Sequence, residues 1–255
     1  MDLRGNYADG RSFDLPKGWA PVEAPLLDLA RTQALTALGA TGSAEMAAAT
    51  ARVGAYYDPA GDYAGVLFQG VEPNDPVTIG ASDLWAVSTL SMKVPATMGR
   101  RLIGSGSHAT HVVRQLQRLP VDLPITDLEA GVLDSMAELQ HTLRSVMSTE
   151  TTASNQWVFA AKMCARKRPL LFPVRDSVVC GYLSGWRPMG GGEGQLGQFS
   201  RDIQVFAFLM TCPQVTSAIS HLRSTLADST PNTLDASDLR LLDVALWMAG
   251  KAEPK

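Results

Sequence analysis

Residues 155–183 read NQWVFAAKMCARKRPLLFPVRDSVVCGYL and organise the predicted fold. The stretch opens with an apolar run that predicts a helix to about Ala165. Arg166-Lys167-Arg168-Pro169 ends this helix, because a residue that precedes proline is pushed out of the helical region. An extended segment over 170–174 follows, and Ser177 begins another helix. The stretch therefore predicts two helices joined by a short extended link.

Helical periodicity extends outward from this stretch over most of the chain. It predicts about ten helices and at most two or three strands, so the expected fold class is mainly α, a multi-helix globule. The helices are expected at 23–38, 43–55, 82–92, after Pro95, 107–119, 126–146, 154–165, 177–183, 199–210, 215–226 and 235–248. A small irregular or β segment is expected near 56–78, where YYDPAGDYAGVLFQGVEPNDPV combines turn dipeptides with a short apolar run.

The clearest helical pattern covers residues 126–146. Thr126 and Glu129 have the spacing of a capping box, in which each side chain satisfies a backbone N–H at the start of a helix. Apolar residues then recur at intervals of three and four, which predicts one buried stripe along the helix. The members of this stripe are Val132, Met136, Leu139, Leu143 and Val146.

The length of 255 residues suits one large domain or two small ones. Residues 1–22 show no periodicity and are expected to form an irregular N-terminal arm. Residues 23–250 are expected to form a single helical domain, with two lobes that meet near 120–126 as the alternative. The prolines at 120 and 124 mark that link.

Composition favours a cytoplasmic protein with no membrane partner. Hydrophobic residues make up 45% of the chain, so a packed core can form. No stretch is apolar enough for a spanning helix, and the charged first twenty residues carry no secretory signal. Three cysteines, Cys164, Cys180 and Cys212, are too few for a disulfide framework, which agrees with a reducing compartment.

The common cofactor motifs are absent from the sequence, so no cofactor and no metal is expected. There is no phosphate loop, no G-x-G-x-x-G, no H-E-x-x-H and no G-x-S-x-G. His108 and His111 share one face of a predicted helix. Two histidines without a third ligand make a poor metal site, so we expect both to lie on the surface of the helix.

Basic residues are concentrated in the middle of the chain, although the net charge is −3. Five of them occur from 162 to 175 without an acidic residue: Lys162, Arg166, Lys167, Arg168 and Arg175. Such a run can attract the phosphates of a nucleic acid even when the whole molecule is acidic. Basic side chains at a solvated helix end are the alternative, because the end of the helix dipole there is negative.

Three short segments resemble an uncharacterised bacterial protein family. They are DLWAVSTLS at 83–91, ARKRPLLFPVRD at 165–176 and LDVALWM at 242–248. The resemblance spans about residues 77–250, and it implies no activity because none is attached to that family.

The stretch 155–183 also resembles, more distantly, the helix-hairpin-helix DNA glycosylases of the endonuclease III group, an all-helical family. That resemblance implies a catalytic aspartate at Asp176, which stabilises the cationic sugar, and an assisting lysine at Lys162. Arg166, Lys167, Arg168 and Arg175 would contact phosphates, while Trp157 and Tyr182 would stack on a base. Two departures stand out. Thr149 to Gln156 lacks the glycines of the family's hairpin, and three cysteines cannot hold an iron–sulfur cluster with four thiolate ligands.

The resulting hypothesis is a nucleic-acid-binding protein that excises a base from DNA, through Asp176 with Lys162 assisting. A carboxylate just before a helix is also a good N-cap, which is the alternative role for Asp176. Two other functions stay open. One is a non-catalytic nucleic-acid-binding module, and the other is a biosynthetic enzyme that depends on tRNA or a small molecule.

Overall fold

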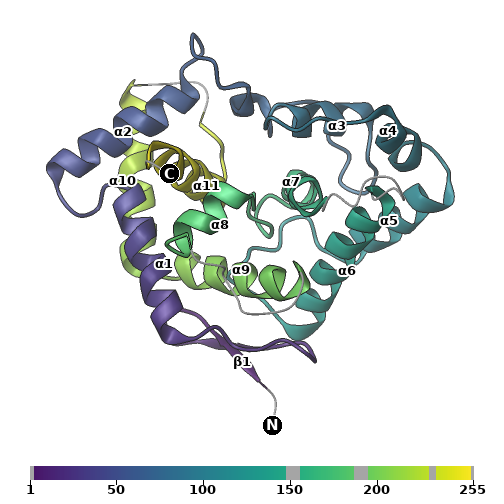
Figure 1. Ribbon diagram of the computed structural model, residues 1–255, viewed down its shortest axis with the longest axis horizontal. Helices are drawn as coiled ribbons and strands as arrows, with labels where there is room; N and C mark the ends of the chain where they lie inside the picture. The colour runs from purple at the N-terminus through teal and green to yellow at the C-terminus, as the bar shows by residue number, and fades with distance from the viewer. Residues whose placement is uncertain (1–2, 148–155, 187–194, 230–233, 254–255) are drawn as a thin grey trace.

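The structure is a computed structural model that describes residues 3–147, 156–186, 195–229 and 234–253 (Figure 1). It is mainly helical, as predicted, with one small sheet. The described strands are β1 (Arg4–Asn6) and β2 (Ser12–Asp14). The described helices are α1 (Ala24–Ala37), α2 (Ser43–Tyr57), the 3-10 helix η1 (Ala64–Leu67), α3 (Ala81–Ser88), α4 (Ala96–Leu102), α5 (Ser107–Gln117), α6 (Ala130–Met147), α7 (Trp157–Lys167), α8 (Ser177–Leu183), α9 (Gln195–Met210), α10 (Pro213–Ser229) and α11 (Asp238–Ala252).

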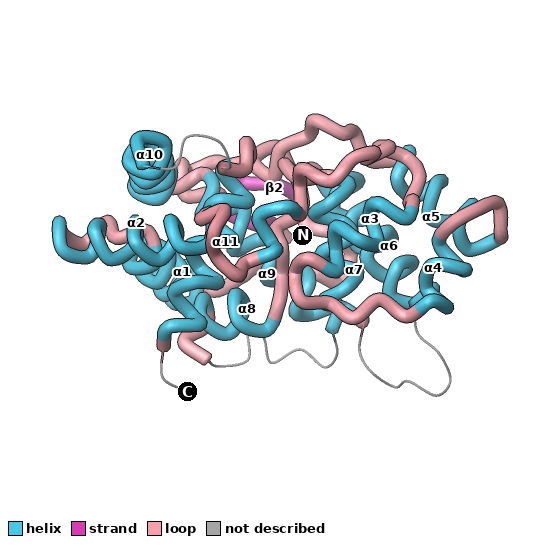
Figure 2. The backbone as a smooth tube through the Cα atoms, turned by 90° about the horizontal axis from the view of Figure 1, so that it is seen from above, coloured by secondary structure: helices cyan, strands magenta, loops and turns pink. Residues whose placement is uncertain are grey.

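The helices form two groups, which are visible in both views (Figures 1 and 2). One group combines the two ends of the chain: α1, α2, α8, α10 and α11 pack on one another. The other group is the middle of the chain, where α4, α5 and α6 pack together and α3 lies beside α7. Helix α7 lies between the groups in Figure 1, and α9 contacts members of both. The link at 120–126 joins α5 and α6, which pack against each other within one group.

Helix α6 carries the predicted buried stripe but begins later than predicted. Met136, Leu139, Leu143 and Val146 are buried, and the first position of the stripe is taken by Leu133. The capping box at Thr126 is wrong, because α6 starts at Ala130 and the Leu133 N–H donates to the Glu129 carbonyl. Residues 126–129 instead form a bend, in which the Leu128 N–H donates to the Tyr7 hydroxyl.

The strands lie in the N-terminal arm rather than near 56–78. β1 and β2 pair antiparallel, with Gly5 opposite Phe13. A Cβ atom at Gly5 would lie 2.4 Å from the Phe13 ring, so only glycine lets this ring cover the strand. Tyr7 and Phe13 are buried in the core, which ties the arm to the helices.

The segment near 56–78 is irregular, which is one of the two alternatives expected from the sequence. Helix α2 reaches Tyr57, η1 follows, and the remainder is turns and extended backbone without strand pairing. Phe68, Val71 and Ile79 are nevertheless buried. An irregular segment with buried residues needs partners for its backbone carbonyls, and these partners come from α7.

No single helix within the described ranges is long and apolar enough to cross a membrane. Phe199–Met210 and Pro213–Ala227 meet that criterion only when they are counted together across a bend of 73°.

Candidate functional site

The basic run at the end of α7 lies inside the protein. Arg166 is 0% exposed, and Lys167, Arg168 and Arg175 are also buried. Buried cations are expensive unless they are paired and hydrogen-bonded, so their partners decide what they do.

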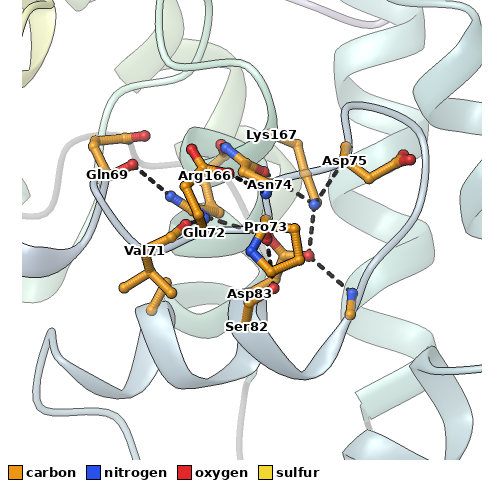
Figure 3. A network of polar contacts seen from close by, with 12 residues as sticks. Gln69, Val71, Glu72, Pro73, Asn74, Asp75, Ser82, Asp83, Arg166 and Lys167 are labelled. Atoms are coloured by element: carbon orange, nitrogen blue, oxygen red, sulfur yellow. Dashed lines mark hydrogen bonds and ion pairs between the residues drawn. The ribbon is translucent and has the colours of Figure 1, made fainter.

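Arg166 and Lys167 hold the irregular segment 68–76 against α7 (Figure 3). The Arg166 guanidinium donates to the carbonyls of Phe68, Gln69 and Val71, and its Nε lies 3.2 Å from Oδ1 of Asp83. Lys167 Nζ donates to the Asp75 carbonyl at 2.8 Å, and to two side-chain oxygens, Oδ1 of Asn74 and Oδ2 of Asp83. Burial lowers the pKa of Lys167, and its bond to Asp83 opposes that shift.

Arg168 and Arg175 point to two further places in the fold. Arg168 donates to the carbonyls of Leu119 and Pro76, each at 2.8 Å. Arg175 Nε donates to Oδ2 of Asp202 at 2.7 Å. Burial raises the pKa of Asp202, and the charge of Arg175 opposes this. These cations therefore tie separate parts of the backbone together.

The expectation that these four cations form an exposed phosphate-binding surface is wrong. Their charge is directed at carbonyls and carboxylates from segments 27 to 98 positions away in sequence, which the local run could not reveal. The two aromatic candidates are also engaged in packing. Tyr182 is buried, and the half-buried Trp157 ring lies 5.3 Å from the Arg175 guanidinium carbon.

Lys162 and Asp176 differ from these packed side chains, because both line one pocket. The empty space of this pocket is about 610 Å³ when the open region at its mouth is counted. The walls of the pocket come from α2, the segment around η1, the end of α3, α7, the 174–179 link and α11. The three segments that resemble an uncharacterised family meet here, through Leu90 and Ser91, Val174 and Asp176, and Asp243 and Trp247.

Asp176 is both an N-cap and a pocket residue. Its Oδ1 accepts the N–H groups of Val178 and Val179, each at 2.9 Å, which starts α8. Within the described chain, Oδ2 has no hydrogen-bond partner. The side chain is half-buried and lines the pocket. The cap thus fixes one oxygen and leaves the other for a ligand.

Lys162 is a buried lysine with a single described acceptor. Its Nζ donates to the Leu90 carbonyl at 2.8 Å. Burial lowers its pKa and the nearby Arg240 adds to this, while the negative charge of Asp176 opposes the shift. An ammonium has three donors, so two remain for the pocket.

Helix α11 contributes four pocket residues with helical spacing: Arg240, Asp243, Val244 and Trp247. Positions i, i+3, i+4 and i+7 share one face of a helix, so this face presents two ionisable side chains and an indole ring to the pocket. Asp243 Oδ2 accepts the Val174 N–H at 2.7 Å, which fixes the link before Asp176. Burial and the charges of Asp176 and Asp235 raise the pKa of Asp243 to about 7, although Arg240 and the Val174 N–H oppose this.

Arg240 is held by the side chains of Tyr56 and Asp235. It donates to the Tyr56 hydroxyl at 2.6 Å, and its Nε lies 3.6 Å from Oδ2 of Asp235. The Tyr57 hydroxyl donates to the same Asp235 oxygen at 2.9 Å. These contacts keep the positive charge of Arg240 at the pocket wall.

Three aromatic rings form one side of the pocket. Tyr56 and Tyr63 stack with centroids 5.6 Å apart, and the Trp247 ring meets Tyr63 edge-on at 5.9 Å. Tyr63 is 37% exposed, so its ring lies at the mouth. Aromatic faces of this kind suit a planar, uncharged ring of a ligand.

Sequence reasoning missed the contribution of α11 and the aromatic wall. The available signal was Arg240 and Asp243, two charges three positions apart within the apolar run LRLLDVALWM. Ionisable residues inside a buried helix face need a partner or a function. For metal ions, the described part of the chain contains no group of three or more His, Cys, Asp or Glu side chains that could hold one.

Residues 49–250 match a family described as "Family of unknown function (DUF6308)". The chain belongs to this family. The matched region of DUF6308 contains every residue that lines the pocket and the whole basic run of α7. Neither a curated protein nor a solved structure matches the chain.

Proposed function

We propose that the pocket hydrolyses N-glycosidic bonds, with the base of a nucleoside unit held inside it. The supporting observation is that Lys162 and Asp176 line the same aromatic-walled pocket. The glycosylase-like hypothesis requires these two residues to lie together.

Asp176 is the carboxylate of the proposed reaction. As the bond between the base and C1′ of the sugar breaks, positive charge develops on the sugar. A fixed carboxylate in a partly buried site stabilises that charge more strongly than water does. The backbone bonds at Oδ1 hold the group in place, and Oδ2 has no described partner that would compete with the sugar.

Lys162 assists in one of two ways. As an ammonium, it orients the substrate with its two remaining donors. As a neutral amine, which burial favours by lowering its pKa, its nitrogen bonds to C1′ while the bond to the base breaks and the base leaves with the electron pair. Loss of a proton from the nitrogen and opening of the C1′–O4′ bond, with O4′ taking a proton, then give a Schiff base. Borohydride reduction distinguishes the two, because only a Schiff base can be trapped.

The substrate of the proposed enzyme is a nucleic acid or a free nucleoside. In a duplex, the base has to leave the stack and enter the pocket, at a cost of a few kcal/mol. The burial of Arg166, Lys167, Arg168 and Arg175 favours the free nucleoside, because these cations are not available to phosphates. Location in the cytoplasm suits either substrate and agrees with the three free cysteines.

The test is release of a free base, measured by chromatography. The panel contains adenosine, guanosine, inosine, cytidine and uridine, and duplexes and single strands that carry uracil, hypoxanthine, 8-oxoguanine or 3-methyladenine. Asp176→Asn keeps an N-cap oxygen and should lower the rate by about 10²- to 10⁴-fold. Asp122→Asn is the matched control, because Asp122 is exposed and away from the pocket.

Three results decide the proposal. Base release that depends on Asp176, but not on Asp122, supports it. Absence of release from the whole panel contradicts it, and so does full activity of Asp176→Asn. Binding of nucleic acid without release would instead support the non-catalytic module, and a salt series would count the phosphates involved.

A further inference from the structure

Asp243 has a buried oxygen that the described part of the protein leaves without a partner. The side chain is 2% exposed, and its Oδ2 is bound to the Val174 N–H. Its Oδ1 has no hydrogen bond to any described group, although Asp243 lines the pocket. Buried polar atoms are almost always hydrogen-bonded, so a lone oxygen beside a pocket indicates a proton or a ligand.

The charged groups around Asp243 favour a proton on this oxygen. Asp176 and Asp235 contribute like charges from two other segments, and burial disfavours a further negative charge. The positive groups that line the same pocket are Arg240, which is engaged by Tyr56 and Asp235, and Lys162. Tyr57 reaches Asp235 rather than Asp243. Together these surroundings raise the pKa of Asp243 to about 7.

Asp243 and Trp247 lie one turn apart on the same face of α11, and both line the pocket. A planar base that stacks on the Trp247 indole therefore has the Asp243 carboxyl on the same wall. Asp176 reaches the pocket from a different segment, at the start of α8. The pocket thus has one carboxyl beside the aromatic wall and another at its α8 end.

We infer that Asp243 is the general acid that protonates the leaving base, while Asp176 acts at the sugar. This role rests on the proposed function. The bond from C1′ to the base nitrogen breaks, its electron pair stays with the base, and the base takes the proton of Asp243. Water then bonds to C1′ and gives its proton to Asp176. Exchange with solvent removes the proton from Asp176 and restores the proton on Asp243, so the net reaction consumes one water and releases the free base and the free sugar hydroxyl.

The test compares leaving groups that do and do not need a proton. One substrate is the member of the panel above from which the base is released fastest. The other is 4-nitrophenyl β-D-ribofuranoside, whose nitrophenolate leaves without protonation. Asp243→Asn removes the proton and keeps an oxygen for the Val174 N–H. It should lower release of the base by about 10²-fold or more, and hydrolysis of the nitrophenyl riboside less than about fivefold.

The pH profile of the wild-type protein is a second measurement that needs no variant. Activity on the base substrate should fall above about pH 7, as Asp243 loses its proton. That alkaline limb should be absent with the nitrophenyl riboside. This comparison keeps the inference testable if Asp243→Asn fails to fold.

The outcomes separate this inference from the proposed function. Equal losses of Asp243→Asn on both substrates, or identical wild-type pH profiles, overturn the role of Asp243 while Asp176-dependent hydrolysis stands. A wild-type protein that is inactive on the panel and on the riboside overturns both. A selective loss on the base substrate, together with loss of the alkaline limb, supports the acid role.

Discussion

Lys162 and Lys167 lie five residues apart on α7, and both are buried, yet their surroundings differ. Lys167 donates to three oxygens, from Asn74, Asp75 and Asp83, so its ammonium is fully used inside the fold. Lys162 donates to one carbonyl and otherwise lines a pocket. A buried ammonium whose hydrogen-bond donors all have acceptors within the protein has a structural role. A buried ammonium with donors left over marks a candidate site. This comparison divides α7 into a structural end and a functional end.

The largest expected effect concerns the structural end. Arg166→Met should lower the free energy of unfolding by about 3–5 kcal/mol, because Oδ1 of Asp83 and the buried carbonyls of Phe68 and Val71 lose their donor. Chemical denaturation measures the change. The exposed Arg114 offers the matched control, since Arg114→Met should change stability by less than about 1 kcal/mol. Similar small values for both variants would contradict the structural role of the basic run.

The next effect is the pH dependence of stability that Asp243 causes. Its pKa is about 7 in the folded protein, against 3.8 for an unperturbed aspartate, so the folded state holds the proton more tightly between these limits. The wild-type protein should therefore lose stability as pH rises from about 4 to 7, by on the order of a few kcal/mol. Asp202 and Asp235 contribute in the same direction, because burial raises their pKa values too.

Denaturation of Asp243→Asn over the same pH range isolates the contribution of Asp243. The slope of stability against pH should become shallower, with the part due to Asp202 and Asp235 remaining. An unchanged slope would show that Asp243 does not hold a proton in the folded state.

A smaller effect is expected from the aromatic wall. Tyr63→Leu removes a ring at the mouth of the pocket and should weaken binding of a free base by about 1–3 kcal/mol, measured by calorimetry. Tyr63→Phe keeps the ring and should bind as the wild type does, since no hydrogen bond of the Tyr63 hydroxyl occurs within the described residues. Equal binding by all three proteins would remove Tyr63 from the site.

The smallest effect separates the two roles of Asp176. Asp176→Ala should cost about 1 kcal/mol of stability through loss of the α8 cap, while Asp176→Asn should cost less, because asparagine also caps helices. Thermal denaturation of the two variants checks this. Equal losses for the two variants would show that the negative charge, rather than the cap oxygen, stabilises the fold.

The helices could be predicted from sequence because their cause is local. The buried stripe of α6 could be predicted from apolar spacing alone, except that Leu133, rather than Val132, is its first buried residue. The start of α6 could not be predicted, because the Tyr7 hydroxyl from the distant N-terminal arm binds the Leu128 N–H. The strands at 4–6 and 12–14 depend on a contact between Gly5 and Phe13 that has little sequence pattern.

The candidate site was predictable only in part. The juxtaposition of Lys162 and Asp176 was a consequence of the resemblance to glycosylases, and the pocket brings the two residues together. Burial of the basic run depends on carbonyls at 68–76 and 116–119, which no local pattern connects with α7. Asp243 becomes a candidate only when α11 is placed beside the link at Val174.

Base release by the wild-type protein and by Asp176→Asn, at matched thermal stability, tests the central claim most directly. If the pocket is the functional site, the wild type releases a base from at least one substrate of the panel, and Asp176→Asn is slower by about 10²-fold or more while its cap and melting temperature persist. Release at the wild-type rate by Asp176→Asn would contradict the account.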